Sequence, residues 1–564
     1  MVTHTGYRAL TPGLIALIAC TAGGCKEAKP PAAAVPVVKT ASTGGMPKEL
    51  AAELFIKHCA ACHGPDGNGD GPAAEQLYPK PRAFRESPLR FAATGATSEK
   101  VLAAITRTIR EGIPRSSMPG FQGTLTDAEI AGVAAYTKGL ADKANAEWRR
   151  ESLAEKPSPM PEYTDGLKAT GAALYVSTGC VACHGDKGHG DGPSMATLKD
   201  SIGRPIHPAN LASGQFKSGN KPEDIYRAIV NGVPGTPMPS YGTQLIEKRR
   251  DGTTSDDKAW ALVTYVQSLA PPAVLPFVAS GAEFRPGVIA NAELTTDPKQ
   301  MGWQSVEHTR VSLRPTWDRD EPIRGLEVAA ARVGSMLAIH LAWEDASPDL
   351  DVDLNVFPDA AAVMFAMGDS VPAIPMGVQV AGHTPASPVN VWQWKAARQF
   401  DATTGVLHDS THPRQMENAN RQEFPLGQVP AKEPVPVSPT GAEYDQELRI
   451  LGELTRPAAA THNPKADPAL FTHAVLEANA EGFGTLLYQE ATHQHANATA
   501  IYANGRWSVT LFRPIQTNDS NDIDLSTPRR IPVAFAIWNG ARGDRGGQKL
   551  ITGWHWLVLD KGAH

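Results

Sequence analysis

The sequence contains the pattern Cys-x-x-Cys-His twice, at residues 59–63 and at residues 180–184. Two cysteines separated by two residues and followed at once by a histidine are typical of covalent haem attachment. The thiols join the haem, and the imidazole binds its iron. A zinc site usually needs about four ligands, and each pattern offers only three. We therefore expect two c-type haems, attached through Cys59, Cys62, Cys180 and Cys183, with His63 and His184 as iron ligands.

The sequence that follows each pattern is also repeated. Gly-Asp-Gly-Pro occurs at residues 69–72 and again at residues 190–193. A Met-Pro pair comes later in each copy: Met118 follows His63 by 55 residues, and Met238 follows His184 by 54. This spacing predicts two tandem domains of one fold, at residues 47–142 and 167–270.

Met118 and Met238 are the expected second ligands of the two irons. Met195 lies too close to His184 to reach the opposite haem face, whereas His189 and His207 remain alternatives in the second copy. Ordinary loop or core methionines are the other interpretation. An iron ligated by histidine and methionine has a raised reduction potential and no open position for substrate. This favours electron transfer and disfavours a dihaem peroxidase.

Helical periodicity recurs at matching places in the two copies. Apolar residues fall on one face in residues 99–109 and again in residues 224–230. Thr126 and Glu129 form a capping box before the last helix of the first copy, and residues 260–269 supply the equivalent helix of the second. With the haem motifs, these features resemble class I cytochrome c domains of the Gly-x-Gly-Asp-Gly-Pro type.

The first 25 residues are typical of an export signal. A short apolar run ends in Leu17-Ile18-Ala19-Cys20, which is similar to a bacterial lipobox with Cys20 as the lipidated residue. Cys25 is a weaker match, and a plain cleaved signal peptide is the alternative. We expect linkers at residues 26–46, 143–166 and 271–300, and a mature protein on the periplasmic side of a bacterial membrane. The net charge of −6 gives no sign of a nucleic-acid partner.

After residue 300 the pattern changes to short runs of β-branched and aromatic residues separated by turns. Residues 400–470 are rich in proline and weakly periodic. We therefore expect a multidomain chain in which two all-α cytochrome c domains precede an all-β sandwich domain at residues 301–564. Residues 400–470 would form a long irregular insertion in it.

Seven short motifs of this last region follow one another in a fixed order. They lie at residues 341–345, 357–363, 375–377, 389–395, 481–485, 505–507 and 547–554. Together they resemble the haem b-binding gamma subunit of ethylbenzene dehydrogenase and of related molybdenum enzymes of the type II dimethyl sulfoxide reductase family. That family includes nitrate, selenate and chlorate reductases and nitrite oxidoreductase. The resemblance implies one non-covalent haem b, a molybdopterin catalytic subunit and an iron–sulfur subunit.

In that family a methionine and a lysine hold the haem b. Carried over, the resemblance favours Met376, with Met364 and Met367 as alternatives. For the lysine it favours Lys549, with Lys561 and Lys395 as alternatives. A lysine that binds iron must lose its proton, which burial promotes. The family's gamma subunit is usually a short separate chain, so fusion behind two cytochrome c domains is a departure.

The resulting hypothesis is an exported electron-transfer subunit that is not itself catalytic. It would relay electrons between a molybdenum/iron–sulfur oxidoreductase and a soluble c-type or membrane carrier. The alternative is a dihaem cytochrome whose β domain binds a ligand, as carbohydrate-binding modules do. Exposed indole rings at Trp392, Trp394, Trp554 and Trp556 would favour that alternative.

Overall fold

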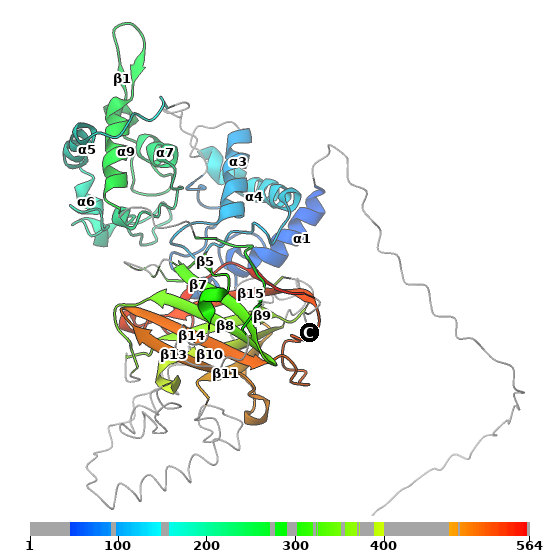
Figure 1. Cartoon of the computed structure of the whole chain (residues 1–564). Coiled ribbons are helices and arrows are strands. Elements are labelled where there is room, and N and C mark those ends of the chain that lie inside the picture. Colours follow the sequence, from blue (N-terminus) through cyan, green and yellow to red (C-terminus); the bar gives the residue numbers. More distant parts are fainter. Residues whose placement is uncertain are drawn as a thin grey trace, which may run out of the picture. The chain divides into compact units, whose positions relative to one another are not determined.

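The computed structural model describes most of the chain after the N-terminal segment (Figure 1). The described residues are 46–91, 98–147, 157–270, 277–289, 302–317, 319, 323, 325–350, 356–368, 371–372, 388–399, 473–482 and 485–560. They all belong to one compact unit, Met46–His564. Cys20, Cys25, Met376, Lys561 and the expected insertion at residues 400–470 lie outside the described residues.

The first helical domain has four α-helices among its described residues. They are α1 (Lys48–His58), α2 (Ala60–His63), α3 (Ser98–Glu111) and α4 (Asp127–Glu147), with a 3₁₀ turn η1 (Ala74–Gln76). The capping box before α4 is confirmed: Thr126 N–H donates to the Glu129 carboxylate at 2.8 Å, and Glu129 N–H donates back to Thr126 Oγ1 at 3.3 Å. Helix α4 continues to Glu147 and so extends into the segment that the sequence suggested as a linker.

The second helical domain repeats this arrangement. Its α-helices are α5 (Asp165–Ser177), α6 (Val181–His184), α7 (Pro222–Asn231), α8 (Gly242–Leu245) and α9 (Asp257–Ser268), with 3₁₀ turns η2 (Met195–Thr197) and η3 (Leu211–Ser213). It also carries a two-stranded antiparallel sheet of β1 (Glu247–Lys248) and β2 (Thr254–Ser255). This hairpin is why the domain is not purely helical.

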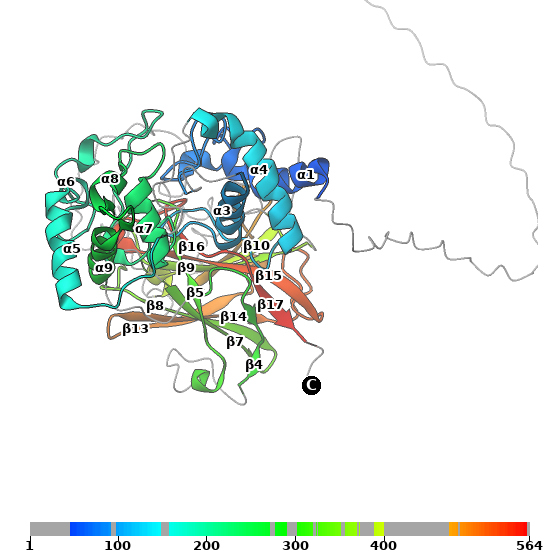
Figure 2. The same ribbon diagram turned by 90° about the horizontal axis from the view of Figure 1, so that it is seen from above.

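Two β-sheets make up the last domain (Figure 2). The six-stranded sheet contains β13 (Asn497–Ala503), β14 (Arg506–Pro514), β8 (Met336–Glu344), β7 (Gly325–Val333), β4 (Gly287–Val288) and β5 (Thr309–Ser312). The nine-stranded sheet has the order β12 (Leu487–Tyr488), β11 (Val475–Ala480), β10 (Val389–Lys395), β9 (Ala360–Ala366), β15 (Arg529–Trp538), β16 (Leu550–Ile551) and β6 (Arg314–Pro315). In addition, β17 (His555–Leu559) pairs with β15, and β3 (Glu283–Phe284) pairs with β17.

One hydrophobic core joins the two sheets. It contains Leu341 and Val509 of the six-stranded sheet together with Phe365, Trp392 and Val533 of the nine-stranded sheet. Side chains alternate between the faces of a strand, so the other face of the nine-stranded sheet presents a separate set of residues. That second face holds the third candidate site described below.

Strands β3 and β4 come from residues that the sequence suggested as a linker. Strand β3 pairs in parallel with β17, and β4 pairs in parallel with β7, so the segment adds one strand to each sheet. Across the described residues, no helix combines the length and the apolar character needed to cross a membrane.

Candidate haem sites

The four residues expected at the first haem line one cavity. Cys59, Cys62, His63 and Met118 all face it, as do Phe55 of α1 and Ile109 of α3. Both thiols are free. The His63 ring donates from Nδ1 to the carbonyl oxygen of Arg82 at 3.1 Å, which leaves Nε2 for a metal. In metal sites, a hydrogen bond from the ring nitrogen that does not bind the metal fixes the orientation of the histidine.

The second cavity is built in the same way. Cys180, Cys183, His184 and Met238 line it, and the His184 ring donates from Nδ1 to the carbonyl oxygen of Ala209 at 2.9 Å. Of the alternative ligands, His207 also lines this cavity, whereas Met195 and His189 are not among its lining residues. The structure therefore brings together all eight residues that the sequence predicted, four in each of two matched cavities.

Burial sets the protonation of these groups. It lowers the pKa of His63 to about 4 and also lowers that of His184, so both imidazoles are neutral at pH 7. A neutral imidazole has a lone pair for iron. Burial raises the pKa of Cys59 and of Cys62 to about 12, so both remain thiols. The donor set and its surroundings therefore fit covalently attached haem in each domain.

In each copy, the two glycines of Gly-Asp-Gly-Pro form hydrogen bonds with the helix that carries the haem-attachment residues. Gly69 N–H donates to the carbonyl of His63 at 2.8 Å, and Gly71 N–H donates to that of Cys62 at 3.2 Å. A Cβ atom on Gly71 would lie 2.4 Å from the carbonyl oxygen of Ala60, so only glycine allows this close approach. The second copy makes the equivalent bonds from Gly190 and Gly192.

The two methionine loops share one hydrogen-bond pattern. Ile113 N–H donates to the carbonyl of Met118 at 3.1 Å, and the Ser116 hydroxyl accepts from Met118 N–H at 3.3 Å. In the second copy Val233 N–H donates to the carbonyl of Met238 at 3.2 Å, and Thr236 takes the role of Ser116. The in-register methionines therefore belong to equivalent loops.

The two cavities share part of their walls. Pro79, Arg90, Phe91 and Lys217 line both of them. Arg90 Nη2 also forms a 2.8 Å ion pair with Asp200, which ties the first helical domain to the second. Motif spacing within each copy contains no information on this contact, so these four residues could not be predicted from it.

The β domain completes the first cavity. Pro372 and Trp554 are among its lining residues. Arg314 of β6 also reaches the first domain: its Nη1 donates to the carbonyl of Met118 at 3.0 Å, and its Nη2 donates to that of Glu111 at 3.1 Å. Burial lowers the pKa of Arg314 only to about 10, so the guanidinium remains charged at pH 7. No motif or repeat in the sequence distinguishes Arg314 from the other arginines.

The outer face of the nine-stranded sheet carries mostly small side chains around one methionine. Its buried cluster consists of Ala360, Ala362, Ala366, Val389, Val391, Ala480, Ala534, Trp538 and Trp554. Met364 of β9 is partly buried and packs against this cluster. Met367 instead packs against the core between the sheets, and its sulfur accepts from Asn479 Nδ2 at 3.5 Å. Among the described methionine candidates, Met364 is the one on this alanine-rich face.

Two candidate lysines lie at one end of the alanine-rich face. Lys395 of β10 and Trp538 of β15 both pair with Ala360 of β9 and so share its side of the sheet. Lys549 Nζ lies 4.8 Å from the centre of the Trp538 ring. Burial lowers the pKa of both lysines to about 8. Small residues, a methionine and lysines that lose a proton readily fit a flat haem with these two ligand types.

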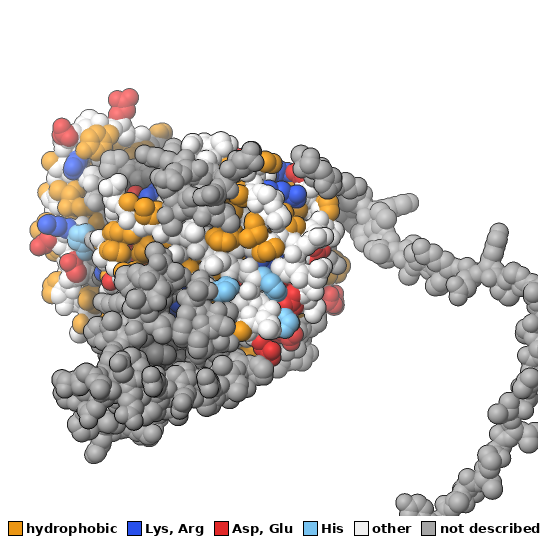
Figure 3. Space-filling model, turned by 60° about the horizontal axis from the view of Figure 1, so that its bottom comes forward, with side chains coloured by type: hydrophobic (Ala, Val, Ile, Leu, Met, Phe, Trp, Pro, Cys, Tyr) orange, Lys and Arg blue, Asp and Glu red, His pale blue; other side chains and the backbone are white. Residues whose placement is uncertain are grey.

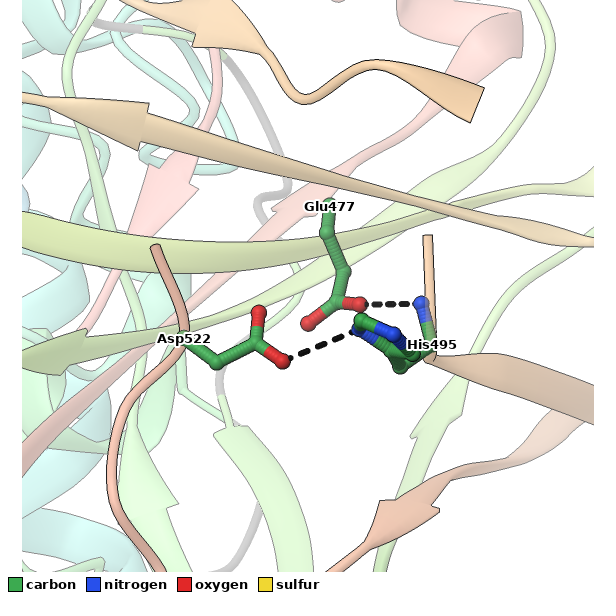
Figure 4. Close-up of side chains that lie close together, drawn as sticks. All are labelled: Glu477, His495 and Asp522. Atoms are coloured by element: carbon green, nitrogen blue, oxygen red, sulfur yellow. Dashed lines mark hydrogen bonds and ion pairs between the residues drawn. The ribbon is translucent and has the colours of Figure 1, made fainter. Parts of the chain in front are cut away.

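A separate group of side chains resembles a metal site but is neutralised internally. Figure 4 shows the side chains of Glu477, His495 and Asp522 close together, and His495 Nδ1 lies 3.1 Å from Asp522 Oδ2. The fully buried Arg513 lies 3.4 Å from Glu477 and 3.5 Å from Asp522. A guanidinium between the two carboxylates supplies the positive charge, so this group has a structural role.

The four tryptophans that would have favoured a carbohydrate-binding domain offer no exposed binding platform. Trp392, Trp394 and Trp554 are buried, and Trp556 is covered by the Arg530 guanidinium, whose Cζ lies 4.3 Å from its ring centre. On the face in Figure 3, hydrophobic side chains occur in several separate groups among polar ones. The observation that would have favoured a carbohydrate-binding domain is therefore not found at these four residues.

Three family models match the chain. The model described as Ethylbenzene dehydrogenase matches residues 300–550, the one described as Cytochrome C oxidase, cbb3-type, subunit III matches residues 31–136, and the one described as Cytochrome c matches residues 168–270. These matches cover the regions for which the sequence analysis proposed the same kinds of domain.

Similar proteins include gamma subunits of two enzymes. The chain is 22% identical to the chlorate reductase subunit gamma of Ideonella dechloratans, over 46% of this chain and 78% of that protein. It is 24% identical to the dimethylsulfide dehydrogenase subunit gamma of Rhodovulum sulfidophilum, over 45% of this chain and 72% of that protein. It is also 27% identical to the cbb3-type cytochrome c oxidase subunit FixP of Bradyrhizobium sp. strain ORS 278, over 38% of this chain and 59% of that protein.

Proposed function

Since the chain joins two cytochrome c domains to a domain of the ethylbenzene dehydrogenase family, we propose that it is the gamma-type haem subunit of a molybdenum/iron–sulfur oxidoreductase. It is an electron-transfer cytochrome. In the proposed complex it relays electrons between the molybdopterin and iron–sulfur subunits and a c-type or membrane carrier. The similar gamma subunits of chlorate reductase and dimethylsulfide dehydrogenase support this role.

The observation that carries the proposal is the pair of matched cavities. Each brings two free thiols, one neutral imidazole and one methionine to a single apolar space. Haem bound there would supply one-electron chemistry, and two protein ligands on its iron would leave no position for substrate. The chain's own residues attach the group, orient the imidazole and exclude water.

We place the three sites in the order second domain, first domain, β domain. The shared wall of Pro79, Arg90, Phe91 and Lys217 supports direct exchange between the two c-type sites. Pro372 and Trp554 support exchange between the first c-type site and the β domain. The first domain is therefore the middle of the relay, and the second domain faces the external carrier.

The third haem belongs to the β domain, which we take to be a β-sandwich. Met364 or Met376 and Lys549 or Lys395 are its proposed iron ligands. The alanine-rich face supports this assignment because small side chains leave space for a flat macrocycle against the sheet. Within the described residues, Met364 and Lys549 both lie at this face.

We propose that the chain works outside the cytoplasm and that lipid on Cys20 tethers it to a membrane. The match to a cbb3-type oxidase subunit supports an extracytoplasmic, membrane-associated place. Cys20→Ala should release the protein from the membrane fraction, whereas the matched variant Cys25→Ala should leave it bound. Mass spectrometry of the mature N-terminus gives the second test. Lipid on Cys25 would change the assigned residue, whereas an unmodified N-terminus would refute the lipid anchor.

Haem analysis of the purified full chain tests the function. Acid extraction followed by a pyridine haemochrome spectrum should give one extractable haem b for every two haems that stay attached. If the purified chain yields no extractable haem and binds a sugar instead, the relay proposal fails and the chain is a ligand-binding cytochrome.

The methionine ligands have their own test. Oxidised protein should show the weak charge-transfer band of a sulfur-to-iron bond, and Met118→Ala with Met238→Ala should leave only the part that the methionine of the haem b contributes. Each single variant should remove about a third of the band, since the three sites are independent. A band unchanged in the double variant would exclude both residues, and a band that Met118→Ala lowers but Met238→Ala does not would leave His207 as the alternative at the second site.

A further inference from the structure

Arg314 belongs to the β domain but bonds to the ligand loop of the first cytochrome domain. Its two hydrogen bonds go to the carbonyls of Met118 and Glu111, at the two ends of the turn that carries the methionine. Gly112 makes room for it, because a Cβ atom there would lie 2.6 Å from Arg314 Nη1. The side chain is only 5% exposed. The Arg314 side chain thus occupies space that Gly112 leaves open, which indicates a specific contact.

The charge of this arginine is not cancelled by its hydrogen-bond partners. Both acceptors are neutral main-chain carbonyls, whereas Arg90 and Arg107 of the first domain pair with Asp200 and Asp224. A buried cation acts over a longer range than an exposed one because water screens it less. The guanidinium is therefore a fixed positive charge beside the Met118 loop.

We propose that Arg314 is a positioning residue for the Met118 ligand and that its charge raises the reduction potential of the first c-type haem. This rests on the proposed ligation of that haem by Met118. The two hydrogen bonds hold the loop at the distance that the sulfur needs, and the charge favours the reduced iron, which carries one positive charge fewer. The β domain thus sets the potential of the middle site in the relay.

The second domain provides an internal reference. Its loop has the same backbone bond from Val233 to Met238 and the same hydroxyl bond from Thr236, while the bonds of Arg314 go to the first loop. The charge that reaches the ligand loop is thus one difference between two sites with matched donor sets, beside Lys80 and Arg82, which line the first cavity alone. This difference separates their potentials and gives the relay a preferred direction between the first and second domains.

Spectroelectrochemical titration of the full haem-loaded chain tests the proposal. Met238→His identifies the second haem in the titration, because replacing methionine as ligand lowers the potential of that haem. Arg314→Gln should then shift the oxidised-to-reduced ratio of the first haem about tenfold towards oxidised, which is about 59 mV for a one-electron couple. Arg314→Lys keeps the charge and should show less than half of that shift.

Arg310→Gln is the matched control, since Arg310 lies on the neighbouring β5 and pairs with Glu327 instead of the methionine loop. It should leave both potentials unchanged. Equal shifts of both haems in Arg314→Gln, or no shift with the sulfur-to-iron band intact, would overturn the proposal. Absence of that band in the wild-type protein would instead overturn the Met118 ligation on which the proposal rests, so the two failures are distinguishable.

Discussion

The indole Nε1 of Trp554 donates a 2.8 Å hydrogen bond to the carbonyl oxygen of Pro372, and both residues line the first haem cavity. Trp554 also belongs to the buried cluster on the alanine-rich face of the nine-stranded sheet. One side chain therefore forms part of the wall of two candidate haem sites. It is the contact through which we expect electrons to pass between the β domain and the first cytochrome domain.

Trp554→Ala should slow electron exchange between the haem b and the first haem c several-fold. Removing the ring opens a gap between the two sites, and core Trp→Ala changes cost about 3–5 kcal/mol in stability. Trp554→Phe is the control, because it keeps an aromatic ring and loses only a hydrogen bond worth about 1 kcal/mol. Flash reduction followed at the separate absorption bands of haem b and haem c measures the rate. A wild-type rate in Trp554→Ala would exclude this route.

Replacement of the two candidate lysines should separate their roles. We expect Lys549→Ala to lose haem b from the purified protein, since Lys549 lies within 4.8 Å of the Trp538 ring at the edge of the alanine-rich face. Lys395→Ala should retain it. The ratio of extractable to attached haem gives the answer for each variant. The reverse result would assign the iron to Lys395, and haem retained in both would leave Lys561 as the remaining lysine.

Gly71→Ala should destabilise the first domain. The added methyl group would lie 2.4 Å from the carbonyl oxygens of Ala60 and Ala61, so the haem-binding helix must move. Overpacking of this kind costs about 1–3 kcal/mol. Gly139→Ala is the control, because Gly139 is exposed on α4 with no atom within 4 Å of the added carbon, and helix propensity should stabilise it by about 1 kcal/mol. Denaturant unfolding compares the two, and equal stabilities would contradict the steric argument.

The pair of His308 and Glu327 should give the β domain a pH-dependent stability. Their 2.8 Å hydrogen bond lowers the pKa of Glu327 to about 2 and raises that of His308 above its usual value. The depressed carboxyl stabilises the fold above about pH 4.5, and this contribution is lost as the pH falls towards 2. The raised histidine contributes below about pH 6.5 and is lost at higher pH.

Glu327→Gln should therefore cost most between about pH 4.5 and 6.5, on the order of 1–2 kcal/mol for a pair that is partly screened by solvent. The cost should be much smaller at pH 2, where about half of the wild-type carboxyl is also protonated. Denaturant unfolding at pH 5.5 and at pH 2 measures both values. The same cost at the two pH values would show that the carboxylate charge is not the source of the stability.

The sequence by itself determined the local chemistry of this protein. Cys59, Cys62 and His63 are neighbours on the chain, so their common site follows from covalent geometry alone. The repeat then predicted Met118 and Met238 as ligands by register, although each lies more than 50 residues from its histidine, and each lines the cavity of its own domain. A repeated spacing carries this information because two copies of one fold must close the same loop over the same group.

Tertiary structure decided how the sites are connected. Arg314 reaches Met118, and Trp554 reaches the first cavity, from segments about 200 and more residues away along the chain. Hydrogen bonds and packing between distant segments leave no periodic trace in one sequence, since a buried arginine and a surface arginine are the same letter. The alanines of β9 belong to one of the seven short motifs, but only strand pairing placed them beside Trp538, which lies next to Lys549.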